Sequence, residues 1–165
     1  MKKFELTSEF VTNIFGTKLF RIKALVEFGD VKAGDMGGYI EKEENLDHDG
    51  DAWVYGDAEV YGDARVYGNA RVCGNARVYG DAEVCGNADY AYAHGFGSVN
   101  RTTTFFRLKD GGVGVRCGCF YGTLQEFQDK VRKTHGETKK AKEYLMLADL
   151  MELRFKEENE DGKNN

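Results

Sequence analysis

The sequence has no proline, and it has no long hydrophobic run. Average usage would place about eight prolines in a chain of this length, so their absence is unusual. The longest apolar stretches, such as residues 24–26, are only a few residues long, which excludes a membrane-spanning helix. The chain begins Met-Lys-Lys-Phe-Glu-Leu-Thr, and because no apolar segment follows this basic start, we expect no signal peptide.

Cysteine and histidine are scarce, which limits metal and nucleophile chemistry. Without a signal peptide, we interpret the four cysteines as reduced thiols of a cytoplasmic protein. Cys117 and Cys119 are two residues apart on one predicted strand face, but no second ligand pair at metal spacing accompanies them. We therefore predict that they are buried small side chains, and we expect no metal and no cofactor. Residues 47–51 resemble part of a calcium loop, but Ala52 stands where glycine is needed, which favours an acidic turn.

Charge is distributed unevenly along the chain, although the net charge is only −5. Residues 35–89 are rich in Asp and Glu, whereas residues 90–145 carry an excess of Lys and Arg. Basic surface attracts anionic partners, so the second segment is the place to expect a ligand. The acidic segment disfavours double-stranded nucleic acid as that ligand.

Residues 54–89 contain six consecutive hexapeptides of one pattern: Val, Tyr or Cys, Gly, Asp or Asn, Ala, and a charged residue. In an extended strand, Ala and the next Val point to the same face, where a small and a β-branched side chain can fill a narrow interior. Gly followed by Asp or Asn is typical of a turn, because glycine accepts positive φ and Asp or Asn caps the bend. The pattern predicts a short strand and a corner, repeated six times.

These hexapeptides resemble the hexapeptide-repeat left-handed β-helix proteins. The resemblance implies that three hexapeptides form one triangular coil, so that residues 18 apart stack, and that the protein is a homotrimer. The outward charges that would then stack are opposite in sign: Glu59 with Arg77, Arg65 with Glu83, and Arg71 with Asp89. Because like charges would repel, this agreement supports the register. Leu46 and Val54 are eight residues apart, so we expect a two-residue bulge near His48.

The sequence therefore predicts a mainly β chain built around a short left-handed parallel β-helix of about three coils. A repeat array has two open ends that need cover. We expect an N-terminal strand cap at 1–34, the β-helix at 35–99, a β-hairpin and two α-helices at 100–157, and a charged tail at 158–165.

The module at 100–157 is expected from turn and helix signals. The glycine-rich residues 109–112 separate two strand-like runs, which indicates a hairpin. We expect its core face to carry Thr102, Thr104 and Phe106. Thr123 and Glu126 form a capping box that opens the first helix, and the second begins near Thr138.

Aromatic, apolar and basic side chains suggest two surfaces. A row of exposed aromatic side chains usually indicates an interface, and the tyrosines of the hexapeptides form such a row. Leucines also widen the apolar face of the second helix. We assign to the oligomer interface Tyr55, Tyr67, Leu147 and Leu150. We assign to a ligand site Arg101, Arg107 and Arg116, on the second face of the hairpin, with Tyr61, Tyr79 and His94.

The layout is similar to proteins of bacteriophages and prophages, which implies work in a bacterial cytoplasm. The segment from Gly34 to Leu46, the hexapeptides, and the Gly-Cys-Phe-Tyr-Gly-Thr-Leu stretch from Gly118 carry this resemblance. The leading hypothesis is a non-enzymatic oligomer that antagonises host defence by binding a host protein or a small anionic signal such as a nucleotide.

Acyl transfer is the enzymatic alternative. Many hexapeptide acyltransferases place a histidine beside a cleft between subunits, where it acts as general base toward an acyl-coenzyme A. His94 would take that role. The long loop that shapes the acceptor site in such enzymes is absent from the repeats, which favours binding. A purely structural oligomer is the third hypothesis.

Overall fold

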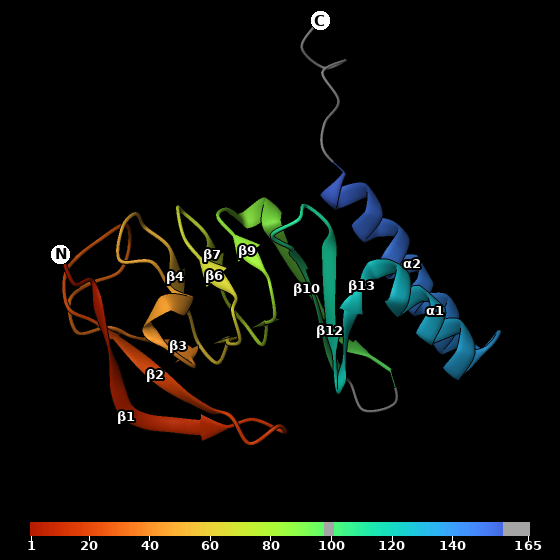
Figure 1. Ribbon diagram of the computed structural model, residues 1–165, viewed down its shortest axis with the longest axis horizontal. Helices are drawn as coiled ribbons and strands as arrows, with labels where there is room; N and C mark the ends of the chain where they lie inside the picture. The colour runs from red at the N-terminus through yellow and green to blue at the C-terminus, as the bar shows by residue number, and fades with distance from the viewer. Residues whose placement is uncertain (98–100, 157–165) are drawn as a thin grey trace, which may run out of the picture.

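The computed structural model describes residues 1–97 and 101–156, and it is mainly β with two helices at the C-terminal end. Figure 1 shows the order of its parts: an N-terminal hairpin, a stack of short repeat strands, a four-stranded sheet and the two helices. The strands before and within the repeats are β1 (Phe4–Thr12), β2 (Lys18–Ala24), β3 (Met36–Ile40), β4 (Trp53–Val54), β5 (Glu59–Val60), β6 (Arg65–Val66), β7 (Arg71–Val72), β8 (Arg77–Val78) and β9 (Glu83–Val84).

The repeat strands stack in parallel at the predicted spacing. Strand β4 pairs with β7, β5 with β8 and β6 with β9, and partners such as Val54 and Val72 are 18 residues apart. The predicted two-residue bulge is confirmed, because Leu46 pairs with Val66 and Tyr39 with Glu59, and both pairs are 20 residues apart. The register predicted for this region is therefore confirmed.

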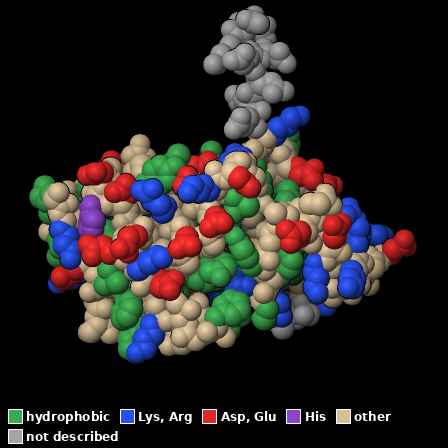
Figure 2. All heavy atoms as spheres, in the orientation of Figure 1, with side chains coloured by type: hydrophobic (Ala, Val, Ile, Leu, Met, Phe, Trp, Pro, Cys, Tyr) green, Lys and Arg blue, Asp and Glu red, His purple; other side chains and the backbone are tan. Residues whose placement is uncertain are grey.

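The interior of the stack contains the Val side chains of the six hexapeptides and the Ala side chains of the first five, which are 0–1% exposed. Ala88, in the sixth, is exposed. At the corners, glycines adopt positive φ; at Gly68, with φ +64°, a Cβ would also lie 2.6 Å from the carbonyl oxygen of Cys85. Outside, acidic and basic side chains are interspersed over the repeats (Figure 2).

One of the three predicted charge contacts forms as expected, between Arg77 Nε and Glu59 Oε2 at 3.4 Å. The predicted contact of Arg71 with Asp89 does not form, because Arg71 Nη1 lies 3.0 Å from Asp30 Oδ2 instead. Asp89 instead lies in a 3₁₀ turn (Asn87–Asp89) that ends the repeats, and its carboxylate accepts from the backbone N–H of Cys85. The register was right, but the end of the repeat redirects this side chain.

The C-terminal sheet consists of β10 (Tyr90–Phe96), β11 (Arg101–Arg107), β12 (Val113–Cys117) and β13 (Phe120–Thr123), all antiparallel. The chain thus leaves the repeats near residue 90, because β10 pairs with β11, and the expected boundary at 99 lies too far along the chain. Residues 98–100 and the tail expected at 158–165 lie outside the described residues.

Both faces of this sheet are covered, which corrects the hairpin prediction. Thr104 is directly opposite Arg116, so Arg116 shares the face of Phe106, which packs into the repeat core. Phe105 and Val115, on the other face, pack against the helices. The strand runs were right, but the pairing register separates Arg116 from Arg101 and Arg107.

The two predicted helices are confirmed as α1 (Leu124–His135) and α2 (Lys139–Phe155). Thr123 Oγ1 accepts from the backbone N–H of Glu126 at 3.2 Å, as the capping box predicts. Thr138 Oγ1 accepts in the same way from Ala141 at 3.3 Å and starts α2. Neither helix is long and apolar enough to cross a membrane, as judged over the described residues.

Candidate functional site

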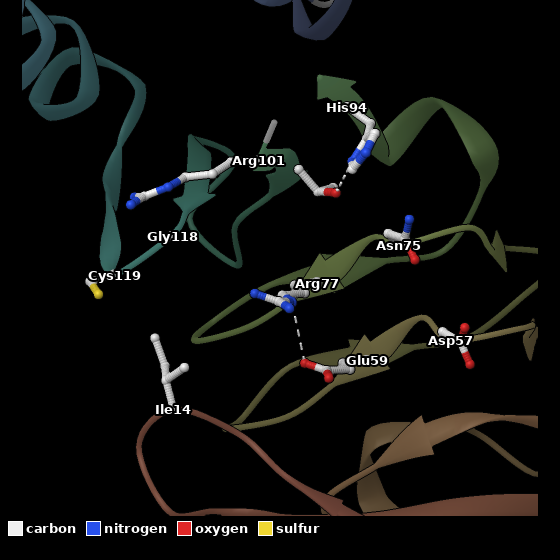
Figure 3. A pocket seen from close by; sticks show the side chains of 10 residues that line it. Ile14, Asp57, Glu59, Asn75, Arg77, His94, Arg101, Gly118 and Cys119 are labelled. Carbon is white, nitrogen blue, oxygen red and sulfur yellow. Dashed lines mark hydrogen bonds and ion pairs between the residues drawn. The ribbon is translucent and has the colours of Figure 1, made fainter. Parts of the chain in front are cut away.

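An open cavity of about 490 Å³, here called the outer pocket, lies where three parts of the chain meet (Figure 3). The turn after β1, the strands β5 and β8 with their corners, and the edge of the C-terminal sheet each contribute side chains. Its lining consists of Ile14, Asp57, Glu59, Asn75, Arg77, His94, Arg101, Thr102, Gly118 and Cys119.

The repeat side of the outer pocket is formed by the stacked pair Glu59 and Arg77. The Glu59 side chain is 15% exposed, whereas Arg77 is 44% exposed. Burial raises the pKa of the Glu59 carboxyl, and the nearby Arg77 and Arg116 oppose that rise. The more exposed partner is therefore a cation, which is available to an anion entering the pocket.

The sheet side carries His94 and Arg101. His94 Nδ1 lies 2.8 Å from Thr102 Oγ1, its cross-strand partner, which orients the imidazole. The guanidinium of Arg101 lies against Gly118, where a Cβ would come within 2.1 Å of Arg101 Nη1 and where φ is +58°. Glycine at 118 therefore lets Arg101 lie across this turn.

Cys119 was expected in the core beside Cys117, and this prediction was wrong for Cys119. Cys117 is buried at the end of β12, but Gly118 turns the chain back toward β13. Cys119 is consequently exposed and faces the outer pocket.

A smaller cavity of about 130 Å³, here called the inner pocket, adjoins the outer one. The two share the side chains of Ile14, Glu59 and Arg77. The inner pocket is otherwise lined by Thr12, Asn13, Tyr61 and Arg116. Four predicted ligand residues are thus brought to two adjoining cavities: His94 and Arg101 to the outer pocket, Tyr61 and Arg116 to the inner one.

Two other predicted ligand residues lie elsewhere. Tyr79 stacks on Tyr61 with ring centroids 4.5 Å apart and lines neither pocket. Arg107 lies 3.8 Å from an oxygen of Asp89 and over the ring of Phe155, because it sits at the opposite end of β11 from Arg101.

Most lining residues of the two pockets were not assigned to a site from the sequence, and three of them matter most: Glu59, Arg77 and Asn13. From the sequence, Glu59 and Arg77 were recognised only as a stacked charge pair. Their 18-residue spacing was the one feature that could have pointed to a charged site there. Asn13 gave no signal, because its place depends on how the β1–β2 hairpin packs against strands far along the chain.

The predicted interface residues differ in exposure. Tyr55 donates to Asp30 Oδ1 at 2.9 Å; burial, and then this hydrogen bond, raises the pKa of Tyr55 to about 12. Tyr67 is half-buried, and the guanidinium of Arg65 lies 5.6 Å from its ring centroid. Leu147 packs partly against the helical core, whereas Leu150 is 54% exposed. Their role in an interface stays a prediction.

Arg77 and Arg101 line one open cavity with an oriented imidazole, which suits an anionic group. The carboxylates of Asp57 and Glu59 line the same cavity, and Glu59 contacts Arg77 at 3.4 Å. The chain matches no protein-family model, and no curated protein is significantly similar to it.

Proposed function

We propose that this chain is an oligomeric binding protein that holds a small anionic ligand, such as a nucleotide, in the outer pocket. The observation that carries the proposal is the convergence of Arg77, Arg101 and His94 on one cavity. Its volume of about 490 Å³ lies within the usual range for small-molecule sites. Guanidinium groups recognise phosphate and carboxylate through paired hydrogen bonds, which suits such a ligand.

The fold that would carry this site is a left-handed β-helix of about three coils, assembled as a homotrimer. The 18-residue parallel register and the buried Ala and Val columns support the coil geometry. Tyr55, Tyr67, Leu147 and Leu150 would form the subunit contacts. If a phage encodes this chain, the protein would antagonise host defence by binding a nucleotide signal or a host protein.

Isothermal titration with a panel of linear and cyclic nucleotides tests the proposal. We expect at least one nucleotide to bind the intact chain. Arg101→Gln should then weaken binding at least tenfold, because a charge-assisted contact is lost. Arg107→Gln is the matched control: it removes an arginine from the same strand but outside both pockets, and binding should be unchanged. Equal losses in the two variants would contradict the proposed site.

Acyl transfer remains a second proposal because Thr102 orients His94 within the outer pocket. If acyl-coenzyme A binds and an acceptor is acylated, His94→Ala should abolish turnover while the fold is retained. If neither nucleotides nor acyl-coenzyme A bind, the purely structural oligomer is favoured. Light scattering at the mass of three chains tests the trimer.

A further inference from the structure

The inner pocket contains a buried cation without a carboxylate contact. Arg116 is only 2% exposed. Its Nε donates to Tyr61 Oη at 2.9 Å and its Nη1 to the carbonyl oxygen of Phe120 at 3.1 Å. Within the described residues, no carboxylate lies within 4.0 Å of this guanidinium, and its Nη2 makes no hydrogen bond. A buried charge is costly unless it is paired, so an anion beside Arg116 would be favourable.

Asn13, which lines the same pocket, has a buried donor without an acceptor. Its Oδ1 accepts from the backbone N–H groups of Phe15 and Thr17 at 2.9 and 3.0 Å. Two backbone donors fix the orientation of the amide, so the other atom is the NH₂ group. That Nδ2 atom is buried and, within the described part of the chain, has no hydrogen-bond partner. A buried donor left unsatisfied costs free energy, so it too favours an incoming acceptor.

The charges around the inner pocket do not balance. Arg77 and Arg116 each carry a positive charge, and among the described residues Glu59 is the one carboxylate in the lining. Glu59 contacts Arg77 at 3.4 Å and also lies near Arg116, whose guanidinium is 4.8 Å from the Phe15 ring centroid. One carboxylate beside two guanidinium groups leaves one net positive charge. The volume of about 130 Å³ exceeds that of a single water, whose share of the liquid is about 30 Å³. The pocket therefore has room for a small oxyanion and one unmatched positive charge to receive it.

We propose that the inner pocket binds a singly charged oxyanion group, a carboxylate or a phosphodiester, between the Arg116 guanidinium and the Asn13 amide. This inference rests on the proposed function, because the group would be the end of the ligand held in the outer pocket. Glu59 and Arg77 line both cavities and mark the junction. The ligand then spans both pockets, with its outer part beside Arg101 and His94.

Asn13→Asp tests the proposal by supplying the oxyanion from the protein itself. The aspartate keeps an oxygen for the turn and places its second oxygen where Nδ2 was, next to the cationic pocket. We expect its melting temperature to exceed that of the wild type without added anion. The matched control is Asn69→Asp, which changes the charge equally at an exposed corner where other repeats already carry Asp.

Acetate and dimethyl phosphate, titrated against chloride at constant ionic strength, are the probes. We expect at least one of them to raise the melting temperature of the wild type and of Asn69→Asp. Asn13→Asp should bind that probe at least tenfold more weakly. A response to acetate alone identifies a carboxylate, and a response to dimethyl phosphate alone a phosphodiester.

Two results would overturn the inner site: no response of the wild type to either probe, or an equal response in Asn13→Asp. Both differ from failure of the proposed function. If nucleotide binding depends on Arg101 but not on Asn13, the outer pocket stands and the inner site is wrong. If no nucleotide binds but a probe still acts through Asn13, the proposed function is wrong, and the inner pocket stands as an oxyanion site alone.

Discussion

The two ends of the repeat region are closed by different chemistry. At the N-terminal end, Phe4 is fully buried in the repeat core, and its ring stacks on His48 with centroids 4.3 Å apart. The buried Lys3 ammonium donates to the carbonyl oxygens of Gly50 and Ala52 at 3.2 and 2.8 Å. These carbonyls belong to the first coil, so one lysine satisfies backbone groups that no preceding coil can reach.

At the C-terminal end, a whole sheet takes the place of the next coil. Phe106 is fully buried against the repeat core. Thr104 Oγ1 accepts from the backbone N–H of Arg77 at 3.0 Å, and Asn87 Oδ1 accepts from that of Arg71 at 3.0 Å. Tyr90 donates to the carbonyl oxygen of Arg71. The end closed by a sheet also acquires the outer pocket, because the sheet edge brings Arg101 and His94 beside the repeats.

Truncating the two phenylalanines should have the largest effect and tests whether both ends depend on packing. Phe4→Ala and Phe106→Ala should each lower the free energy of unfolding by about 3–5 kcal/mol. Urea denaturation measures this loss. Phe106→Ala should also weaken ligand binding, since its strand carries Arg101, whereas folded Phe4→Ala should bind normally. A loss below about 1 kcal/mol in either variant would show that its end is not sealed as described.

Removing the polar caps should have a smaller effect. Lys3→Met leaves the carbonyls of Gly50 and Ala52 without a donor, and Thr104→Val leaves the N–H of Arg77 without an acceptor. Each should cost about 1–3 kcal/mol of unfolding free energy, measured by urea denaturation. Lys2→Met is the control: Lys2 is exposed, so its replacement should change stability by less than about 0.5 kcal/mol. A neutral Lys3→Met would mean that water satisfies these carbonyls.

The smallest effect should appear at high pH, where buried tyrosines of the C-terminal sheet and helices contribute beside Tyr55. Burial raises the pKa of Tyr90, and it raises the pKa of Tyr144 to about 12. Above pH 10 the unfolded chain loses these phenolic protons while the folded chain keeps them, so stability falls as pH rises. The fall attributable to Tyr144 should be about 1 kcal/mol between pH 10 and 11.

Chemical denaturation across this range, with Tyr144→Phe as the comparison, measures the effect. The unfolding free energy of the variant should fall less steeply with pH than that of the wild type. An equal fall in both would contradict the raised pKa of Tyr144. Lys3, in the N-terminal cap, should change stability with pH in the opposite direction. Burial lowers the pKa of Lys3, so the unfolded chain binds more protons below pH 10.5 and this lysine does not contribute to the decline.

Much of the repeat region followed from the sequence, because its pattern is local. Ala and Val two residues apart fix which side chains point inward, and the spacing of Leu46 and Val54 gave the bulge. The candidate site was only partly predictable. Arg101, Arg116, His94 and Tyr61 were named from residue type, but Arg107 was grouped with them wrongly, since strand register was not known.

The sequence by itself determined the parallel register, the Ala and Val interior, and the cap at Thr123, because each depends on residues close together or repeated at a fixed step. Only the tertiary structure decided that β10 joins the C-terminal sheet, that Arg116 is buried beneath the repeats, and that Asn13 lies beside it. These features depend on contacts between distant segments, where packing and backbone satisfaction at an open end outweigh local preference.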